Sequence, residues 1–144
     1  MSEPSKILIV DDNPSNMELL TAYVEELENV AIDTAGDGEA ALEAVRRFEP
    51  DVILLDVMMP KMSGFEVCER LKSDPATRDI QVIMVTALNE HADKERGADC
   101  GTDEFLSKPV DRITLLMRVK NLLKVRQLKK ELDDIKGQDA GDDR

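Results

Sequence analysis

Five polar side chains that follow apolar runs could together perform phosphoryl chemistry. They are Asp11, Asp12, Asp56, Thr86 and Lys108. Two carboxylates about 4 Å apart repel each other by roughly 4 kcal/mol at an effective dielectric near 20, so a crowded acid cluster needs a cation. Oxygen ligands without His or Cys favour Mg²⁺ over zinc, and a lysine and a hydroxyl suit phosphoryl oxygens. Together these residues predict a phosphoryl-acceptor site, although each alone also fits a helix cap or a solvated loop.

Five short apolar runs predict the strands that position these side chains. The runs are 6–10, 30–34, 51–55, 81–85 and 103–106. Amphipathic stretches alternate with them and predict five helices, the first begun by Asn13 as N-cap and by Pro14. Consecutive apolar residues in strands that alternate with helices are typical of a doubly wound α/β fold, whose parallel sheet is covered on both faces. The carboxyl ends of such strands share one edge, where ligands bind.

Composition and charge restrict the class of protein. The 144 residues fit one domain, and the net charge of −12 would repel nucleic-acid phosphates, so no direct nucleic-acid binding is expected. No apolar run approaches the roughly 20 residues that span a bilayer, so no membrane role is expected. The N-terminus lacks a leader pattern and the two cysteines lack metal-ligand spacing, which favours a cytoplasmic protein.

Four ordered motifs resemble the receiver domain of bacterial two-component response regulators. They are Asp11–Asp12, the segment LLDVMMPKMSG around Asp56, Thr86–Ala87 and Lys108–Pro109. The resemblance covers residues 4–124 and implies a CheY-like, flavodoxin-like fold, with a five-stranded sheet in the order 2-1-3-4-5 flanked by five helices. It also implies a phosphorelay function, in which a sensor histidine kinase or a histidine phosphotransfer protein supplies the phosphoryl group.

The resemblance implies a role for each acid on the rim. Asp56 would be the nucleophile that takes the phosphoryl group from a partner phosphohistidine and becomes an acyl phosphate. Asp11, Asp12 and Asp56, together with the backbone carbonyl of Met58, would hold Mg²⁺. Lys108 would pair with the phosphoryl oxygens.

The resemblance further implies a conformational switch and a special peptide bond. Thr86 would move toward the phosphoryl group, and Phe105 would turn inward behind it, which would change the surface around helix 4, strand 5 and helix 5. Lys108–Pro109 would be a cis peptide that aims the lysine inward. Gly64 is expected to have a plain turn role in the loop after Asp56.

Two departures from the usual receiver pattern carry hypotheses of their own. In the predicted fourth helix, 89–100, Glu95 stands where related domains carry an apolar residue, so this helix is expected to be weakly held and the most mobile. Met58 and Leu88 are bulky and apolar, and we expect them to shield an acyl phosphate from water and slow its hydrolysis.

The C-terminal sequence predicts a helix that continues beyond the domain. Residues 125–136 follow a hydrophobic pattern that resembles a coiled-coil linker, although a solvated helix end would also fit. The acidic residues 137–144 are expected to be disordered. A homodimer could form through the surface of helix 4, strand 5 and helix 5, or through the C-terminal helix.

Two other functions remain as alternatives. An aspartyl-phosphate phosphatase would also use a strand-end Asp, but related enzymes place a second Asp two residues later, where this chain has Met58. A flavodoxin-like cofactor-binding domain needs a phosphate-binding loop after the first strand, and Asp11–Asp12 would repel that phosphate. We therefore expect a signalling switch that phosphorylates itself and does not turn over a free substrate.

Overall fold

The computed structural model describes residues 3–87 and 100–142, and of residues 136–142 the backbone only. The strands are β1 (Ser5–Val10), β2 (Val30–Ala35), β3 (Val52–Asp56), β4 (Gln81–Thr86) and β5 (Glu104–Ser107). The helices are α1 (Pro14–Val24), α2 (Gly38–Phe48), α3 (Gly64–Ser73) and α5 (Arg112–Asp142). These strands match the five predicted ones to within a residue at each end. Residues 89–99 of the predicted fourth helix lie outside the described ranges, and so does the mobility predicted for it.

The five strands form one parallel sheet in the order β2-β1-β3-β4-β5. This order confirms the doubly wound fold. β3 and β4 are buried along their whole length, which explains why their apolar residues are consecutive and do not alternate with polar ones. Because all strands run in one direction, their carboxyl ends meet at one edge.

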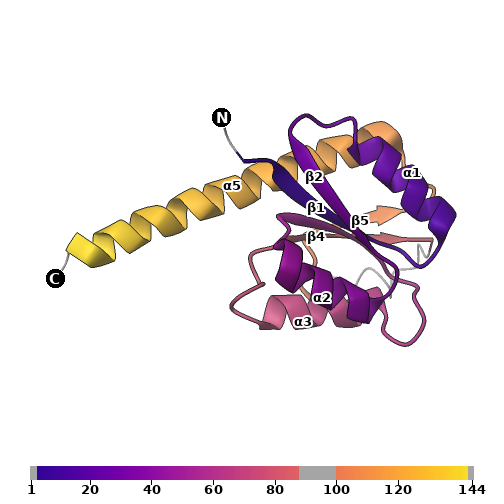
Figure 1. The fold of residues 1–144 in the computed structure, drawn as a ribbon, viewed down its shortest axis with the longest axis horizontal. Helices are drawn as coiled ribbons and strands as arrows, with labels where there is room; N and C mark the ends of the chain where they lie inside the picture. The colour runs from indigo at the N-terminus through magenta and orange to yellow at the C-terminus, as the bar shows by residue number, and fades with distance from the viewer. Residues whose placement is uncertain (1–2, 88–99, 143–144) are drawn as a thin grey trace.

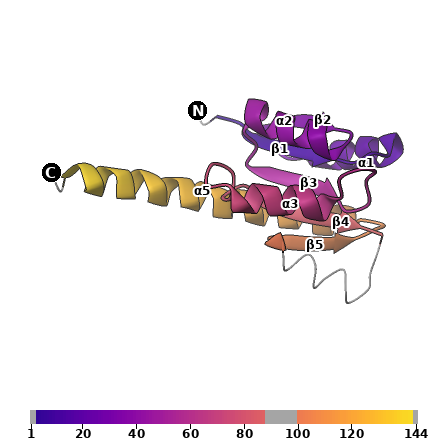
Figure 2. The same cartoon turned by 90° about the horizontal axis from the view of Figure 1, so that it is seen from below.

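Two hydrophobic clusters hold the helices against the two faces of the sheet (Figures 1 and 2). One cluster joins α2 and α3 to side chains such as Leu8, Ile53 and Met84. The other joins α1 and α5 to the alternate strand residues, such as Ile7 and Leu54. Each strand therefore contributes side chains to both clusters, and the layers fix the sheet edge that carries the polar residues.

Three helices begin at side chains that cap their first backbone N–H groups. Asn13 accepts from Ser15 N and Asn16 N and is followed by Pro14, as predicted. Asp37 begins α2 and Ser63 begins α3 in the same way. The caps satisfy N–H groups that have no partner within the helix, and they fix where the loops after β1, β2 and β3 end.

α5 continues well beyond the sheet, and both ribbon views show it leaving the domain (Figures 1 and 2). We call residues 125–142 the α5 arm. The helix ends at Asp142 and thus includes residues 137–142, for which composition predicts disorder. The composition of residues 137–142 shows only that they have no apolar face to bury. Their backbone nevertheless continues the helical hydrogen bonding of the preceding turns. Among the described residues, no helix is long and apolar enough to cross a membrane.

A buried acid at the opposite edge of the sheet attaches the α5 arm to the domain. Asp51 precedes β3 and is only 6% exposed. Its Oδ1 lies 2.6 Å from Lys130 Nζ and 3.8 Å from Arg126 Nε, while its Oδ2 accepts from Lys6 N at 2.8 Å. The sequence indicated Asp51 only as the start of a strand. Its role depends on Lys130, which is 79 residues away in the chain.

Candidate functional site

The carboxyl edge of the sheet brings the predicted polar residues together from four strand ends. Asp11 follows β1, Asp56 is the last residue of β3, Thr86 is the last residue of β4, and Lys108 follows β5. The parallel register aligns these ends. The expectation that one edge carries all of them is therefore met by the fold.

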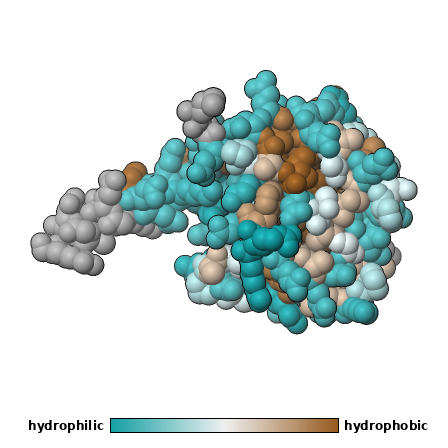
Figure 3. Space-filling model, in the orientation of Figure 1, coloured by the Kyte–Doolittle hydropathy of each residue, from teal (hydrophilic) through white to brown (hydrophobic). Residues whose placement is uncertain are grey.

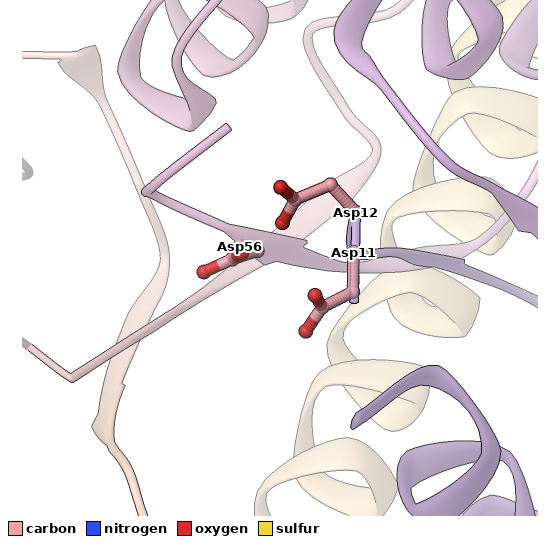
Figure 4. A group of neighbouring side chains, drawn as sticks. All are labelled: Asp11, Asp12 and Asp56. Carbon is pink, nitrogen blue, oxygen red and sulfur yellow. The ribbon is translucent and has the colours of Figure 1, made fainter. Parts of the chain in front are cut away.

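Three carboxylates form the centre of the site (Figure 4). One carboxylate oxygen from each of Asp11, Asp12 and Asp56 lies within 4.8 Å of the other two. Asp11 and Asp56 are 2% and 4% exposed, whereas Asp12 is open to solvent. Burial of two like charges beside a third is unfavourable unless a cation compensates them. The cluster therefore has the donor chemistry of a site for a hard divalent cation.

Lys108 supplies one positive charge to this cluster. Its Nζ lies 3.4 Å from Asp11 Oδ2 and 3.4 Å from Asp56 Oδ1. The Lys108–Pro109 peptide is cis, as predicted, and Lys108 N donates to Thr86 O at 2.7 Å. Three carboxylates and one ammonium leave a net charge of about −2 when all are ionised. A single lysine cannot neutralise the site, and a divalent cation would.

The pKa of Asp56 is raised to about 6 by this environment. Burial of the carboxylate is the largest cause, and the negative charge of Asp11 acts in the same direction. The charge and hydrogen bond of Lys108, followed by the backbone N–H of Met58, oppose the shift. The protein therefore compensates the charge of Asp56 only in part, and an added positive charge would favour its carboxylate form.

The remaining predicted residues lie around the cluster in different environments. Thr86 is fully buried at the end of β4. Phe105 is half-buried on β5 and packs against the cluster that holds α2 and α3. Met58 is 59% exposed directly after the site. Leu88 lies outside the described residues, so its predicted shielding role remains a prediction.

Gly64 is a site residue whose importance the sequence did not indicate beyond a turn. It is the first residue of α3, and its N–H donates to Val57 O at 3.0 Å. A Cβ atom at this position would lie 2.2 Å from the carbonyl oxygen of Asp56. The helix start therefore packs directly on the backbone that carries Asp56. In the sequence, Gly64 is simply a glycine eight residues after the strand-end acid, which does not distinguish close packing from a turn.

Comparisons with known proteins agree with this geometry. Residues 7–120 match the model of the response regulator receiver domain family. The chain is 44% identical over 128 residues to the response regulator PleD of Caulobacter vibrioides, covering 89% of this chain but only 28% of PleD. It is 39% identical to protein PilH of Pseudomonas aeruginosa, covering 83% of this chain and 98% of PilH.

A solved structure gives the same result for the fold. The receiver domain of a signal transduction histidine kinase from Syntrophus aciditrophicus has a TM-score of 0.77 and 37% identity, covering 83% of this chain and 90% of that one. The family match covers most of the chain and includes all the strands and the acid cluster. This protein therefore belongs to the response regulator receiver domain family, and it is a phosphoacceptor domain of two-component signalling.

Proposed function

We propose that Asp56 is the residue that accepts the phosphoryl group, from a phosphohistidine on a sensor histidine kinase or a histidine phosphotransfer protein. An oxygen of the Asp56 carboxylate would bond to phosphorus while the bond from phosphorus to the histidine nitrogen breaks. The imidazole leaves with the electron pair of that bond and takes up a proton. Receiver domains take part in exchange of this kind with histidine kinases and phosphotransfer proteins.

The observation that carries the proposal is the convergence of three carboxylates and one lysine at the end of β3. Asp11 and Asp56 both contact Lys108, and one oxygen of each acid lies within 4.8 Å of the other two. Of these two, Asp56 is the last residue of β3. The strand is buried and fixes the backbone of Asp56, while the loop after it opens to solvent. A buried, positioned carboxylate beside an ammonium group is suited to nucleophilic attack on a phosphoryl group.

Mg²⁺ is the cation that fits the acid cluster, and receiver domains in general bind it at an acidic pocket. In this chain Asp11, Asp12 and Asp56, with the backbone carbonyl of Met58, would hold the ion. When bound, it neutralises the charge of these acids and of the phosphoryl oxygens. Lys108 would hold a further phosphoryl oxygen. Its present contacts with Asp11 and Asp56 keep its ammonium group at that position.

Thr86 and Phe105 would convert the chemical change into a change of surface. Thr86 is the last residue of β4, and its backbone carbonyl accepts from Lys108 N, so Thr86 and the lysine are joined through their backbones. Phe105 lies two residues before the end of β5, next to Met84 in the register. A movement of the Thr86 hydroxyl toward the phosphoryl group would leave space that the Phe105 ring can enter. The surface formed by β5 and α5 would then change its shape.

Intact mass spectrometry tests the proposed function directly. The protein is incubated with Mg²⁺ and acetyl phosphate, and the mass of one added phosphoryl group is expected. Hydroxylamine at neutral pH cleaves an acyl phosphate to the hydroxamate, whereas it leaves a phosphoserine or phosphothreonine ester intact. Absence of the adduct, or hydrolysis of a phosphate ester in repeated turnovers, would contradict the assignment and favour an enzyme.

Removal of the exposed member of the cluster should weaken Mg²⁺ binding. Asp12→Asn is expected to raise the dissociation constant of Mg²⁺ at least about tenfold, because the ion loses one anionic oxygen ligand. Isothermal titration calorimetry measures this constant. Glu43→Gln removes the same charge from the exposed face of α2 and should change the constant by less than about twofold. If both substitutions changed the dissociation constant equally, Mg²⁺ binding would depend only on the net charge of the protein.

Met58→Asn tests the shielding hypothesis. The Met58 side chain is 59% exposed, directly after the site, where an apolar group can keep water from the acyl phosphate. An amide would admit and orient a water molecule, and we expect hydrolysis about threefold to tenfold faster. The decay of the adduct is followed by mass after the phosphodonor is removed. Met117→Asn, at an exposed methionine on α5, is the control, and an unchanged lifetime in Met58→Asn would exclude shielding.

A further inference from the structure

The α5 arm exposes a row of large apolar side chains. Val125, Leu128, Leu132 and Ile135 are 37%, 55%, 50% and 54% exposed. Their 3-4-3 spacing places them on one face of the helix. In Figure 3 hydrophobic side chains interrupt the otherwise hydrophilic surface of the arm. Four exposed residues of this size on one face are typical of a surface that another molecule covers.

The domain holds the other face of the arm. Lys130 and Arg126 contact the buried Asp51, as described above. At about 100° per residue, Arg126 and Lys130 point in nearly the same direction, and the apolar row points roughly the opposite way. The first turns of the arm are therefore fixed to the domain with the row turned outward, and the row is exposed to solvent among the residues that the structure describes.

The charges of α5 are divided between its two halves. Residues 118–130 contain six basic side chains and no acid, whereas residues 131–142 contain five acids and one lysine. Packed helices lie about 8–10 Å apart, which is close to the screening length of about 8 Å at physiological salt, so charges on paired helices are only partly screened from each other. A parallel pair of arms would place the basic half of one arm beside the basic half of the other. An antiparallel pair would place the basic half of each arm beside the acidic half of the other.

The apolar row is also symmetric along the chain. Val125 and Ile135 lie five residues on either side of Lys130, and Leu128 and Leu132 lie two residues on either side of it. A two-fold axis beside Lys130 would therefore pack Val125 against the partner's Ile135 and Leu128 against the partner's Leu132. Such self-complementarity is what a two-fold interface requires.

We propose that two copies of this chain associate through an antiparallel pairing of their α5 arms, centred at Lys130. The domains would lie on opposite sides of the pair, because each arm is held from its basic face. Lys129 and Glu131 lie on either side of the row. Across the two-fold axis, Lys129 would approach the partner's Lys129, and Glu131 would approach the partner's Glu131. These like-charge contacts and the shortness of the row limit the affinity, so the dimer should form in a concentration-dependent manner.

Sedimentation analysis over a range of concentrations tests the association. It uses the unphosphorylated full chain without Mg²⁺, so its outcome does not depend on the role of Asp56. We expect the wild type to dimerise, and Leu128→Lys or Leu132→Lys to raise the dissociation constant at least about tenfold. Leu19→Lys is the matched control, because Leu19 is 48% exposed on α1, outside the row. A monomeric wild type, or a dimer that both arm variants leave intact, would overturn the proposal.

Cysteine cross-linking tests the orientation of the pair. In an antiparallel dimer residue 125 faces the partner's residue 135, whereas two copies of residue 125 are separated by ten residues, or about 15 Å. A mixture of Val125→Cys and Ile135→Cys chains should form a disulfide-linked dimer under mild oxidation, and neither variant alone should. The native Cys68 and Cys100 are buried. The wild type, oxidised in the same way, shows how much cross-linking these two cysteines give by themselves. Cross-linking of Val125→Cys with itself would show a parallel pair and overturn the proposed geometry.

Discussion

We expect phosphoryl uptake to be lost in Asp56→Asn and retained in Asp51→Asn. The two acids lie at opposite ends of β3 and are similarly buried, at 4% and 6% exposed. Only Asp56 has the other carboxylates and Lys108 beside it. An amide at position 56 removes the nucleophilic oxygen while keeping the size of the side chain, so the rate of phosphorylation by acetyl phosphate should fall by at least about a thousandfold. Intact mass over time gives this rate.

Asp51→Asn serves as the control for loss of a buried carboxylate in itself. It removes the negative partner of Lys130 and Arg126 and should lower the free energy of unfolding, but the opposite edge of the sheet keeps its acids. Thermal unfolding of both variants shows whether each remains folded. If Asp56→Asn still gains one phosphoryl group at the wild-type rate, then Asp12, the exposed acid of the cluster, becomes the first candidate acceptor.

The fold and the set of residues that form the site were predictable, because both depend on short stretches of sequence. Apolar runs of four or five residues predicted the strands, and the doubly wound topology then required their carboxyl ends to meet. Asp11, Asp56 and Lys108 could be placed together by that rule alone. The cap at Asn13 was likewise indicated by residues adjacent in the chain, whereas the cis bond before Pro109 was implied by the resemblance to receiver domains.

Features that depend on distant partners could not be predicted. Asp51 opens an apolar run, and only the folded chain shows that the arm returns to it 79 residues later. Thr86 was expected at an accessible rim, yet it is fully buried at the end of β4. Gly64 looks like a turn residue in the sequence. Its contact with the backbone of Asp56 appears only when α3 is docked on the sheet.

Gly64→Ala is expected to destabilise the protein and to disturb the site together. The added Cβ would lie 2.2 Å from Asp56 O, 2.9 Å from Asp56 C and 2.9 Å from Val57 Cα. All three are backbone atoms of the strand end, so no side-chain rotation can relieve the contact. Either α3 or the end of β3 must move. We expect the free energy of unfolding to fall by about 2–4 kcal/mol, as for other overpacked buried positions.

Gly36→Ala is the matched control, because nothing lies within 4 Å of a Cβ at position 36. Alanine restricts the unfolded chain in both variants, which by itself stabilises a protein by about 0.4–1 kcal/mol where the backbone allows it. The free energies of unfolding of the two variants, measured with denaturant, should therefore differ by well over about 2 kcal/mol. Because the strain at Gly64 acts on the backbone of Asp56, the phosphorylation rate of Gly64→Ala should also fall under conditions where the variant is fully folded. Equal stability and equal rate in the two variants would mean that α3 can withdraw from β3 without moving Asp56.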